Sequence, residues 1–268
     1  MQKIPSLRGH EADGGAPDDR ARDIRLVCTA AQLVLENGGE VYRVEETAMR
    51  MAKGLGLSDV SVAAFPTSIF VDACGRTRIR RISRRGNNLT RLAHINDVSR
   101  RVECGEMTAA AAEEAMARIA AEHSVRQRTL VIAYALAAAS FALMFGGGLM
   151  EFAAAFVIGL AVQAVQPLFA GMAMGALLGN FTGGLITAVA AQLSAMPAPG
   201  LNVNAAIIGG IMPLLSGLLM TTAVRDTMYG DLVSGVVRAV EALLIAASVA
   251  LGVYAGLKLM AMTGGAAG

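Results

Sequence analysis

The sequence contains no tryptophan, and aromatic residues make up only 4% of it. Its three cysteines lie far apart and form no CxxC pair, so they indicate neither a disulfide framework nor a zinc site. The three histidines likewise lack the spacing of metal ligands. We therefore expect a protein without a metal or other cofactor.

Signatures of enzymes are also missing. The GxSxG, HExxH and P-loop motifs do not occur, which argues against an enzyme. A net charge of +2, without a long basic run and interleaved aromatics, does not predict a nucleic-acid partner. The chain begins with a polar stretch instead of an apolar signal core, so we expect residues 1–20 to form a disordered tail and the N-terminus to stay in the cytoplasm.

Charge is scarce in the second half of the chain. Of the 23 basic and 21 acidic residues, only seven lie after Thr129. This contrast predicts a small α+β cytoplasmic domain at residues 21–128 and a transmembrane domain at residues 129–262. The expected fold class is an α-helical membrane protein with a five-span bundle.

Apolar periodicity in the first domain predicts helices at residues 18–37, 40–53, 88–102 and 108–124. Asn87 or Asn88 is a candidate N-cap of the third helix, and Thr108 begins the fourth. Alternating residues between the second and third helices predict a small sheet, interrupted at Pro66 and at a turn over residues 74–76.

The last strand of this sheet is strongly basic. Its arginines, with those just after it, are Arg76, Arg78, Arg80, Arg81, Arg84 and Arg85. An anionic ligand or lipid headgroups are one interpretation. A solvated edge strand is the favoured one, because arginines at 78 and 80 flank Ile79.

Five apolar segments follow, at residues 130–147, 152–165, 168–193, 203–223 and 233–258. At about 1.5 Å per residue most are long enough for a hydrocarbon core of about 30 Å, and the second is short for it. Arginines before the first segment and after the fourth predict a cytoplasmic N-terminus and an external C-terminus.

Two segments carry backbone signals. Pro213 lies inside the fourth segment, where it frees a backbone carbonyl, and transporters use broken helices to coordinate substrates. The third segment has a glycine at every fourth position, which predicts a groove for close helix packing, at Gly171, Gly175, Gly179 and Gly183.

The ionisable residues of the candidate site interrupt the end of the apolar half, at Arg225, Asp226, Asp231, Arg238 and Glu241. If a helix begins near Asp231, then Asp231, Ser234, Arg238 and Glu241 share one narrow face. An ionisable side chain at the bilayer centre costs about 2.5–3.5 kcal/mol, so such residues usually face other helices or a pathway. We interpret the stripe as a substrate or coupling path; the alternative is a set of structural ion pairs.

The order of several motifs resembles the bacterial threonine/serine exporter family. The resemblance covers about residues 24–257 and rests on GGEVYRVEETAMRMAKGLGL, VAAFPTSIFV, RRGNNLTRLAHINDVSRRVECGEMTAAAAEEAMARI and IMPLLSGLLMTTAVRDTMYGDLVSGVVRAVEALLIAASVALG. It implies a cytoplasmic domain followed by five spans, and export of small carboxylate metabolites driven by an ion gradient. The family's functional positions map onto Pro213, Arg225, Asp226, Asp231, Arg238 and Glu241.

Fused members of that family continue into a second set of spans. The chain is therefore similar to the two-subunit type, in which a small membrane subunit supplies the other half and succinate is an associated substrate. The resemblance thus implies a multi-pass subunit of an exporter in the bacterial inner membrane, handling threonine, serine or succinate. Self-association into a homo-oligomer is a further possibility, and a membrane-anchored cytoplasmic ligand sensor or scaffold is the alternative function.

Overall fold

Two compact units make up the chain, residues 1–122 and residues 123–268. The computed structural model describes residues 17–83, 86–122, 126–169, 171–172 and 174–262. Most of the predicted N-terminal tail, and Arg84 and Arg85 of the arginine cluster, lie outside these residues.

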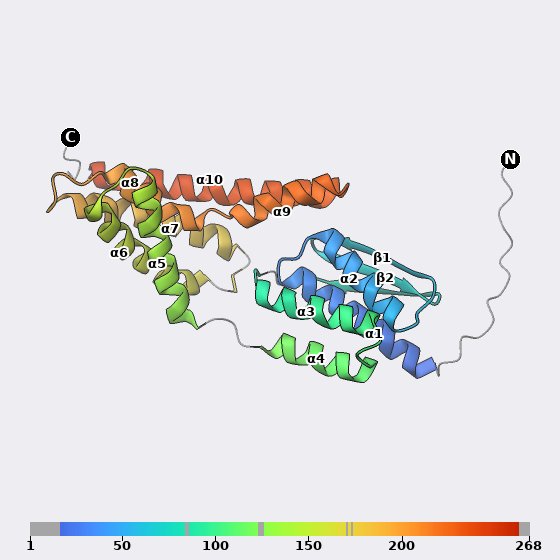
Figure 1. Cartoon of the computed structure of the whole chain (residues 1–268). Coiled ribbons are helices and arrows are strands. Elements are labelled where there is room, and N and C mark those ends of the chain that lie inside the picture. The colour runs from blue at the N-terminus through green and yellow to red at the C-terminus, as the bar shows by residue number, and fades with distance from the viewer. Residues whose placement is uncertain (1–16, 84–85, 123–125, 170, 173, 263–268) are drawn as a thin grey trace, which may run out of the picture. The chain divides into compact units, whose positions relative to one another are not determined.

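The described part of the first unit contains four helices and three strands (Figure 1), which are α1 (Pro17–Glu36), α2 (Val41–Gly54), β1 (Val60–Phe65), β2 (Ser68–Ala73), β3 (Arg76–Arg81), α3 (Leu89–Glu103) and α4 (Ala109–Ala121). The predicted caps are confirmed. The Asn88 side chain accepts a hydrogen bond from the backbone N–H of Arg91 at 3.0 Å, and Thr108 accepts one from Ala111 at 3.4 Å. Each cap satisfies a backbone N–H in the first turn of its helix.

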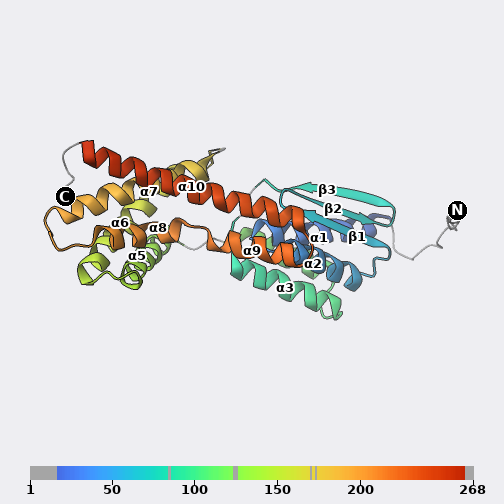
Figure 2. The same ribbon diagram turned by 90° about the horizontal axis from the view of Figure 1, so that it is seen from above.

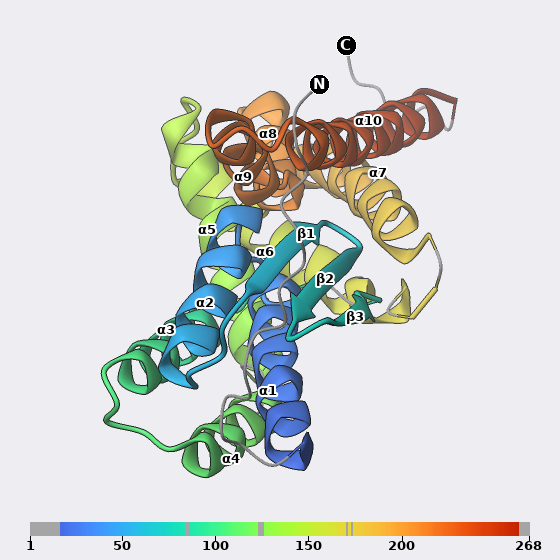
Figure 3. The same ribbon diagram turned by 90° about the vertical axis from the view of Figure 1, so that its right-hand side faces the viewer.

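The strands form an antiparallel sheet in the order β1-β2-β3. Helices α1 and α2 pack against one side of the sheet, and α3 and α4 pack against those two helices (Figure 3). The predicted turn is confirmed: Cys74 and Gly75 have φ values of 52° and 71° between β2 and β3. A tight two-residue hairpin turn has positive φ at both central residues, because this backbone twist matches the twist of the flanking strands.

The register of β3 reverses the expected orientation of its side chains. Arg78 pairs with Val71 and Arg80 with Ile69, and both apolar partners are buried under the helices. The two arginines therefore lie at the edge of the covered face, half-buried. Ile79 points to the opposite face and is 63% exposed. The prediction of an edge strand is confirmed, but the assignment of these arginines to its solvated face is wrong, because the cross-strand register decides which face each residue joins.

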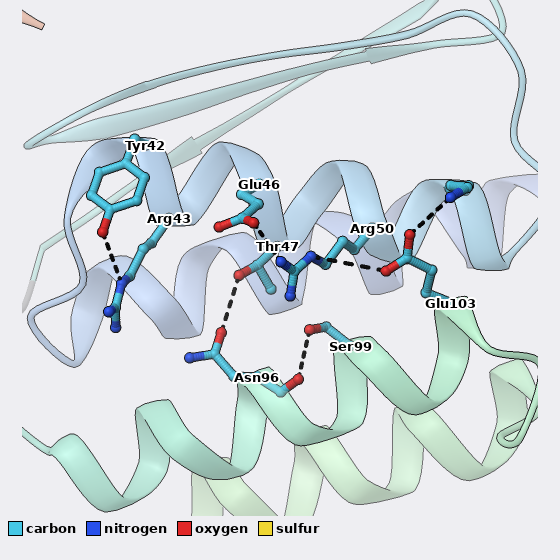
Figure 4. A network of polar contacts seen from close by, with 9 residues as sticks. Tyr42, Arg43, Glu46, Thr47, Arg50, Asn96, Ser99 and Glu103 are labelled. Atoms are coloured by element: carbon cyan, nitrogen blue, oxygen red, sulfur yellow. Dashed lines mark hydrogen bonds and ion pairs between the residues drawn. The ribbon is translucent and has the colours of Figure 1, made fainter. Parts of the chain in front are cut away.

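Polar side chains on α2 and α3 form a network along the contact of the two helices (Figure 4). Thr47 donates to the Asn96 side chain at 3.4 Å, and Glu103 accepts from Lys53 at 2.9 Å. Arg50 lies between Glu46 and Glu103. These contacts lie mostly at the surface, where ion pairs contribute little free energy, so the core rather than the network stabilises the unit. Cys28 is buried in that core, whereas the other two free cysteines, Cys74 and Cys104, are exposed.

The second unit consists of helices, which are α5 (Gln127–Met144), α6 (Leu149–Val165), η1 (Gln166–Phe169), α7 (Gly175–Ala195), α8 (Val203–Ile211), η2 (Met212–Leu214), α9 (Gly217–Met228) and α10 (Leu232–Met262). Among the residues that the structure describes, four helices are long and apolar enough to cross a membrane, or up to five if a bent pair counts as one span. These features are those of an α-helical membrane protein.

Two predicted spans differ from the observed helices. The second apolar stretch continues through η1 and covers Leu149–Phe169, which is long enough for the bilayer core. The helix of the third apolar segment, α7, starts at Gly175 and not at residue 168. Gly171 adopts φ +92°, which is incompatible with a right-handed helix, so a helix cannot continue through this position. Gly171 thus lies outside the helix, and the prediction of a four-glycine groove is wrong at that position.

Other glycines make the closest helix contact. A Cβ at Gly184 would collide with the Val249 carbonyl, and a Cβ at Gly252 would collide with the Phe181 carbonyl. A Cβ at Gly256 would also lie too close to α7, at 2.8 Å from the Leu185 carbonyl oxygen. Small residues on both helices therefore let the α7 and α10 backbones approach each other (Figure 2).

Candidate functional site

The candidate site is built on the pair of helices α9 and α10, which run side by side (Figures 1 and 2). Among the described elements, α9 packs extensively against α10 alone. A side chain at Gly235 of α10 would collide with the Thr227 hydroxyl of α9, so this glycine permits the close approach. A glycine at this position therefore lets the two helices pack closely.

An ion pair lies between these helices. Arg238 Nε is 2.9 Å from Asp226 Oδ2, and the two side chains are 5% and 0% exposed. The sequence interpretation named Asp231 and Glu241 as residues that could neutralise Arg238 in structural ion pairs. The structure records an ion pair between Arg238 and Asp226 of the preceding helix. Two opposite charges in a dry contact attract strongly, but each has lost its hydration, so both must be present for the contact to be stable.

The other members of the polar stripe have separate positions. Asp231 caps α10, because its carboxylate accepts a hydrogen bond from the backbone N–H of Ser234 at 3.1 Å. Ser234 is fully buried, and its hydroxyl has no hydrogen-bond partner among the described residues. Glu241 is half-buried one turn beyond Arg238. The prediction that the stripe follows one face is confirmed for Ser234 and Arg238, which both face the helix contact.

The depth of the ion pair follows from the length of α10. Arg238 and Lys258 are 20 residues apart on this helix, or about 30 Å at 1.5 Å per residue. That distance equals the hydrocarbon thickness of about 30 Å. A bilayer that leaves Lys258 at one surface therefore leaves Arg238 near the other. The ion pair would then lie at a membrane boundary, where water can reach the helix end.

Arg225, next to Asp226, has the opposite environment. It was expected in a loop after the fourth span, but it lies in the last turn of α9 and is exposed. With its neighbours along that helix face it lines a surface pocket of about 520 Å³, made by Met220, Thr221, Val224, Arg225, Met228 and Tyr229. Successive residues in a helix point about 100° apart, so one of the two charges can be buried while the other meets the pocket.

Pro213 marks the break in the fourth predicted span. It lies in η2, and the segments Val203–Leu214 and Gly217–Met228 are bent by 53° relative to each other. Proline has no N–H for the helical hydrogen-bond pattern and clashes with the preceding turn, which explains the break. The break predicted at Pro213, within the apolar segment 203–223, is therefore confirmed.

Sequence reasoning missed Glu151. This buried carboxylate accepts hydrogen bonds from the backbone N–H of Gly148 and of Asn202, each at 2.6 Å. It thereby joins the loop before α6 to the loop before α8, where the Asn202 side chain caps the helix through Ala205. The local half of this arrangement has a sequence signal, a glutamate three residues after the helix start. The contact with Asn202 joins residues 51 positions apart, and no local pattern in the sequence signals it.

The site shows no sign of a metal centre within the described residues, where no group of three or more potential ligands lies together. Its chemistry is that of charges: a buried ion pair, an exposed guanidinium and a broken helix. Such features bind and release anions and protons.

Comparisons with known proteins identify the family. A family model of threonine/serine exporters matches residues 25–260. The chain belongs to the threonine/serine exporter family. A protein named "Probable threonine/serine exporter" from Mycobacterium tuberculosis (strain ATCC 25618 / H37Rv) is 26% identical to this family member over 267 residues. The match covers 94% of the chain and 49% of that protein, so the chain spans about half the length of this relative. No solved structure matches the chain.

Proposed function

We propose that the chain is a subunit of a secondary exporter that moves small carboxylate metabolites across the bacterial inner membrane. The substrate class is an amino acid of the threonine/serine type or a dicarboxylate such as succinate, and residues 21–128 lie in the cytoplasm. The observation that carries the proposal is the division of charge on α9, with Asp226 buried against Arg238 and Arg225 exposed in a pocket.

In this proposal Arg225 recognises the substrate carboxylate. A guanidinium can donate two parallel hydrogen bonds to a carboxylate, and the pocket around Arg225 is mostly apolar with Thr221 and Tyr229 as polar members. Arg238 is unsuited to the same first contact, because its side chain is 5% exposed and faces Asp226. The exposed arginine is therefore the candidate for binding, and the buried pair is the candidate for coupling.

The coupling step uses Asp226 and Arg238. Protonation of Asp226 would remove the negative charge 2.9 Å from Arg238 Nε, and weakening the neutralisation of a buried charge is costly. The helix pair would then have to separate or accept another anion. The helix contact would thus have a closed state, with the ion pair formed, and an open state. Protonation of Asp226 and binding of a substrate carboxylate would each favour the open state, and such a shared two-state contact is what exchange of protons for substrate requires. The break at Pro213 gives α9 a point about which to move.

A partner completes the proposal. The match covers 49% of the M. tuberculosis relative, so that protein has about as much sequence again outside the match. We place the missing part in a separate small membrane protein of the same family, and a second copy of this chain is the other option. The glycine-rich packing of α7 on α10 is a property of one chain and does not depend on which partner is present.

Efflux of labelled threonine and of labelled succinate tests the proposal, in cells that express the full chain with the candidate partner. We expect Arg225→Gln to lower the initial efflux rate about tenfold or more, because hydrogen bonds to a charged group contribute about 1.5–3 kcal/mol each. Arg225→Lys should retain an intermediate rate. Arg118→Gln, an exposed arginine of α4, is the matched control and should leave efflux unchanged. Wild-type efflux in both Arg225→Gln and Arg238→Ala would contradict the proposal and favour a membrane-anchored sensor.

A further inference from the structure

The sheet of the first unit has one open face, and the central row of that face is apolar. The helices cover the face that carries Ile69 and Val71. On the other face the register places Ala63, Phe70 and Ile79 in one row across the three strands. Ile79 is 63% exposed at the centre of the edge strand.

An aromatic pair extends this apolar row. Phe65 is 38% exposed and meets the Phe70 ring edge-on, with ring centroids 6.0 Å apart. The open face carries one carboxylate in its outer row, Asp72, whose oxygen accepts a hydrogen bond from Thr77 at 2.9 Å. An ordinary solvated sheet would present polar residues at the centre of this face. The open face therefore has the composition of a contact surface.

Positive charge lies along the edge strand that borders the open face. Four of the six residues in β3 are arginines, at positions 76, 78, 80 and 81. None of the four makes an ion pair with a carboxylate within the described residues. Arg84 and Arg85 follow directly in the sequence. The register places Arg81 on the open face, whereas Arg76, Arg78 and Arg80 leave the same edge strand toward the covered face. Guanidinium groups along the edge of a face with exposed aromatic and aliphatic side chains complement a surface that is anionic outside and apolar beneath.

We propose that the open face of this sheet, with its border of β3 arginines, docks on the anionic lipid headgroups of the membrane in which the same chain is embedded. Phosphate groups would receive the arginines, while Ile79 and Phe65 enter the interfacial region between headgroups. The proposal does not depend on transport. It assigns the first unit a membrane-facing side, which the exporter function alone does not require.

The covalent connection makes this partner available. Helix α4 ends at Ala121 and α5 begins at Gln127, so five residues join the two. Such a link reaches about 20 Å when fully extended. The local concentration of bilayer around the first unit is therefore high, and a weak surface contact is enough to hold the sheet there. A polyanion such as RNA has no comparable tether, although it offers the same charge.

A probe at Ile79 tests the proposal on the full chain in lipid nanodiscs. Cys74 and Cys104 are replaced by serine, Ile79→Cys carries an environment-sensitive fluorophore, and the lipids carry a headgroup-level spin label. The matched control is Ala117→Cys, an exposed position of α4, which packs on α1 and α3 and not on the sheet. The nanodiscs contain either phosphatidylcholine alone or a mixture in which about one lipid in three is phosphatidylglycerol.

We expect the spin-labelled lipids to quench the fluorophore at position 79 in the anionic discs. The double variant Arg76→Gln/Arg81→Gln should reduce this quenching about tenfold or more, since each basic residue near an anionic bilayer contributes to the attraction. Both substituted arginines are exposed, so the fold should persist. Quenching should fall at high salt, and position 117 should stay unquenched. Absence of quenching at position 79 in the anionic discs, or equal quenching at 79 and 117, would overturn the proposal. So would a silent Ile79 probe together with charge-dependent binding of RNA, which would make this surface a polynucleotide site.

Discussion

The ion pair between α9 and α10 gives the sharpest prediction, because both side chains are nearly inaccessible and only 2.9 Å separates their charged atoms. Removal of one partner from a buried pair costs about 3–5 kcal/mol, since the remaining charge stays buried without a counter-ion. We expect that cost to appear as separation of α9 from α10, because α9 packs extensively against α10 alone among the described elements. At about 1.4 kcal/mol per tenfold, opening of the helix pair should rise at least 100-fold.

A cysteine at Ser234 reports this opening. Ser234 is fully buried beside the pair, so a thiol there should react with a water-soluble maleimide only when the helices separate. The background carries serine at the two exposed native cysteines. We expect Asp226→Asn to accelerate labelling about 100-fold or more. A cysteine at Val249, buried where α10 meets α7, is the matched control and should stay protected.

The double variant Asp226→Asn/Arg238→Gln separates charge from packing. If the cost arises from an unpaired charge, the double variant should label much more slowly than Asp226→Asn alone, because two neutral amides can share a hydrogen bond. Labelling of the double variant as fast as the single one would refute that reasoning. So would an Asp226→Asn variant within about twofold of the parent, since the pair would then contribute little.

Three further predictions concern packing, capping and thiol reactivity. Gly252→Ala should lower the free energy of unfolding by about 1–3 kcal/mol in a denaturation series, because its methyl group would collide with the Phe181 carbonyl. The control is Gly217→Ala, whose methyl group would meet nothing within 4 Å and should leave stability nearly unchanged. Glu151→Gln should lower the thermal unfolding midpoint, since an amide oxygen is a weaker acceptor for two backbone N–H groups than a carboxylate, and an unchanged midpoint would exclude a role in joining the two loops. Maleimide should label the two exposed native cysteines of the folded protein and reach Cys28 only after denaturation, because burial shields that thiol and raises its pKa. Labelling of all three cysteines at equal rates would contradict the buried position of Cys28.

The sequence determined the features that depend on neighbours along the chain. Asn88 and Thr108 cap their helices as predicted, because a cap needs only a side-chain oxygen three residues before a free N–H. The turn at Cys74 and the helix break at Pro213 are also local, since each follows from the backbone geometry of a few residues. The apolar segments were visible for the same reason, because their composition is a property of each segment alone.

Tertiary structure decided which residues meet. Nothing in the spacing of Arg238 distinguished Asp226 from Asp231 or Glu241 as its ion-pair partner, because the choice depends on how α9 returns against α10. The register of β3 likewise turned Ile79 outward, since a shift of one residue exchanges the two faces of a strand. Helix crossing and strand register are set by packing across the whole unit, so local patterns propose the candidate residues and only the folded chain selects among them.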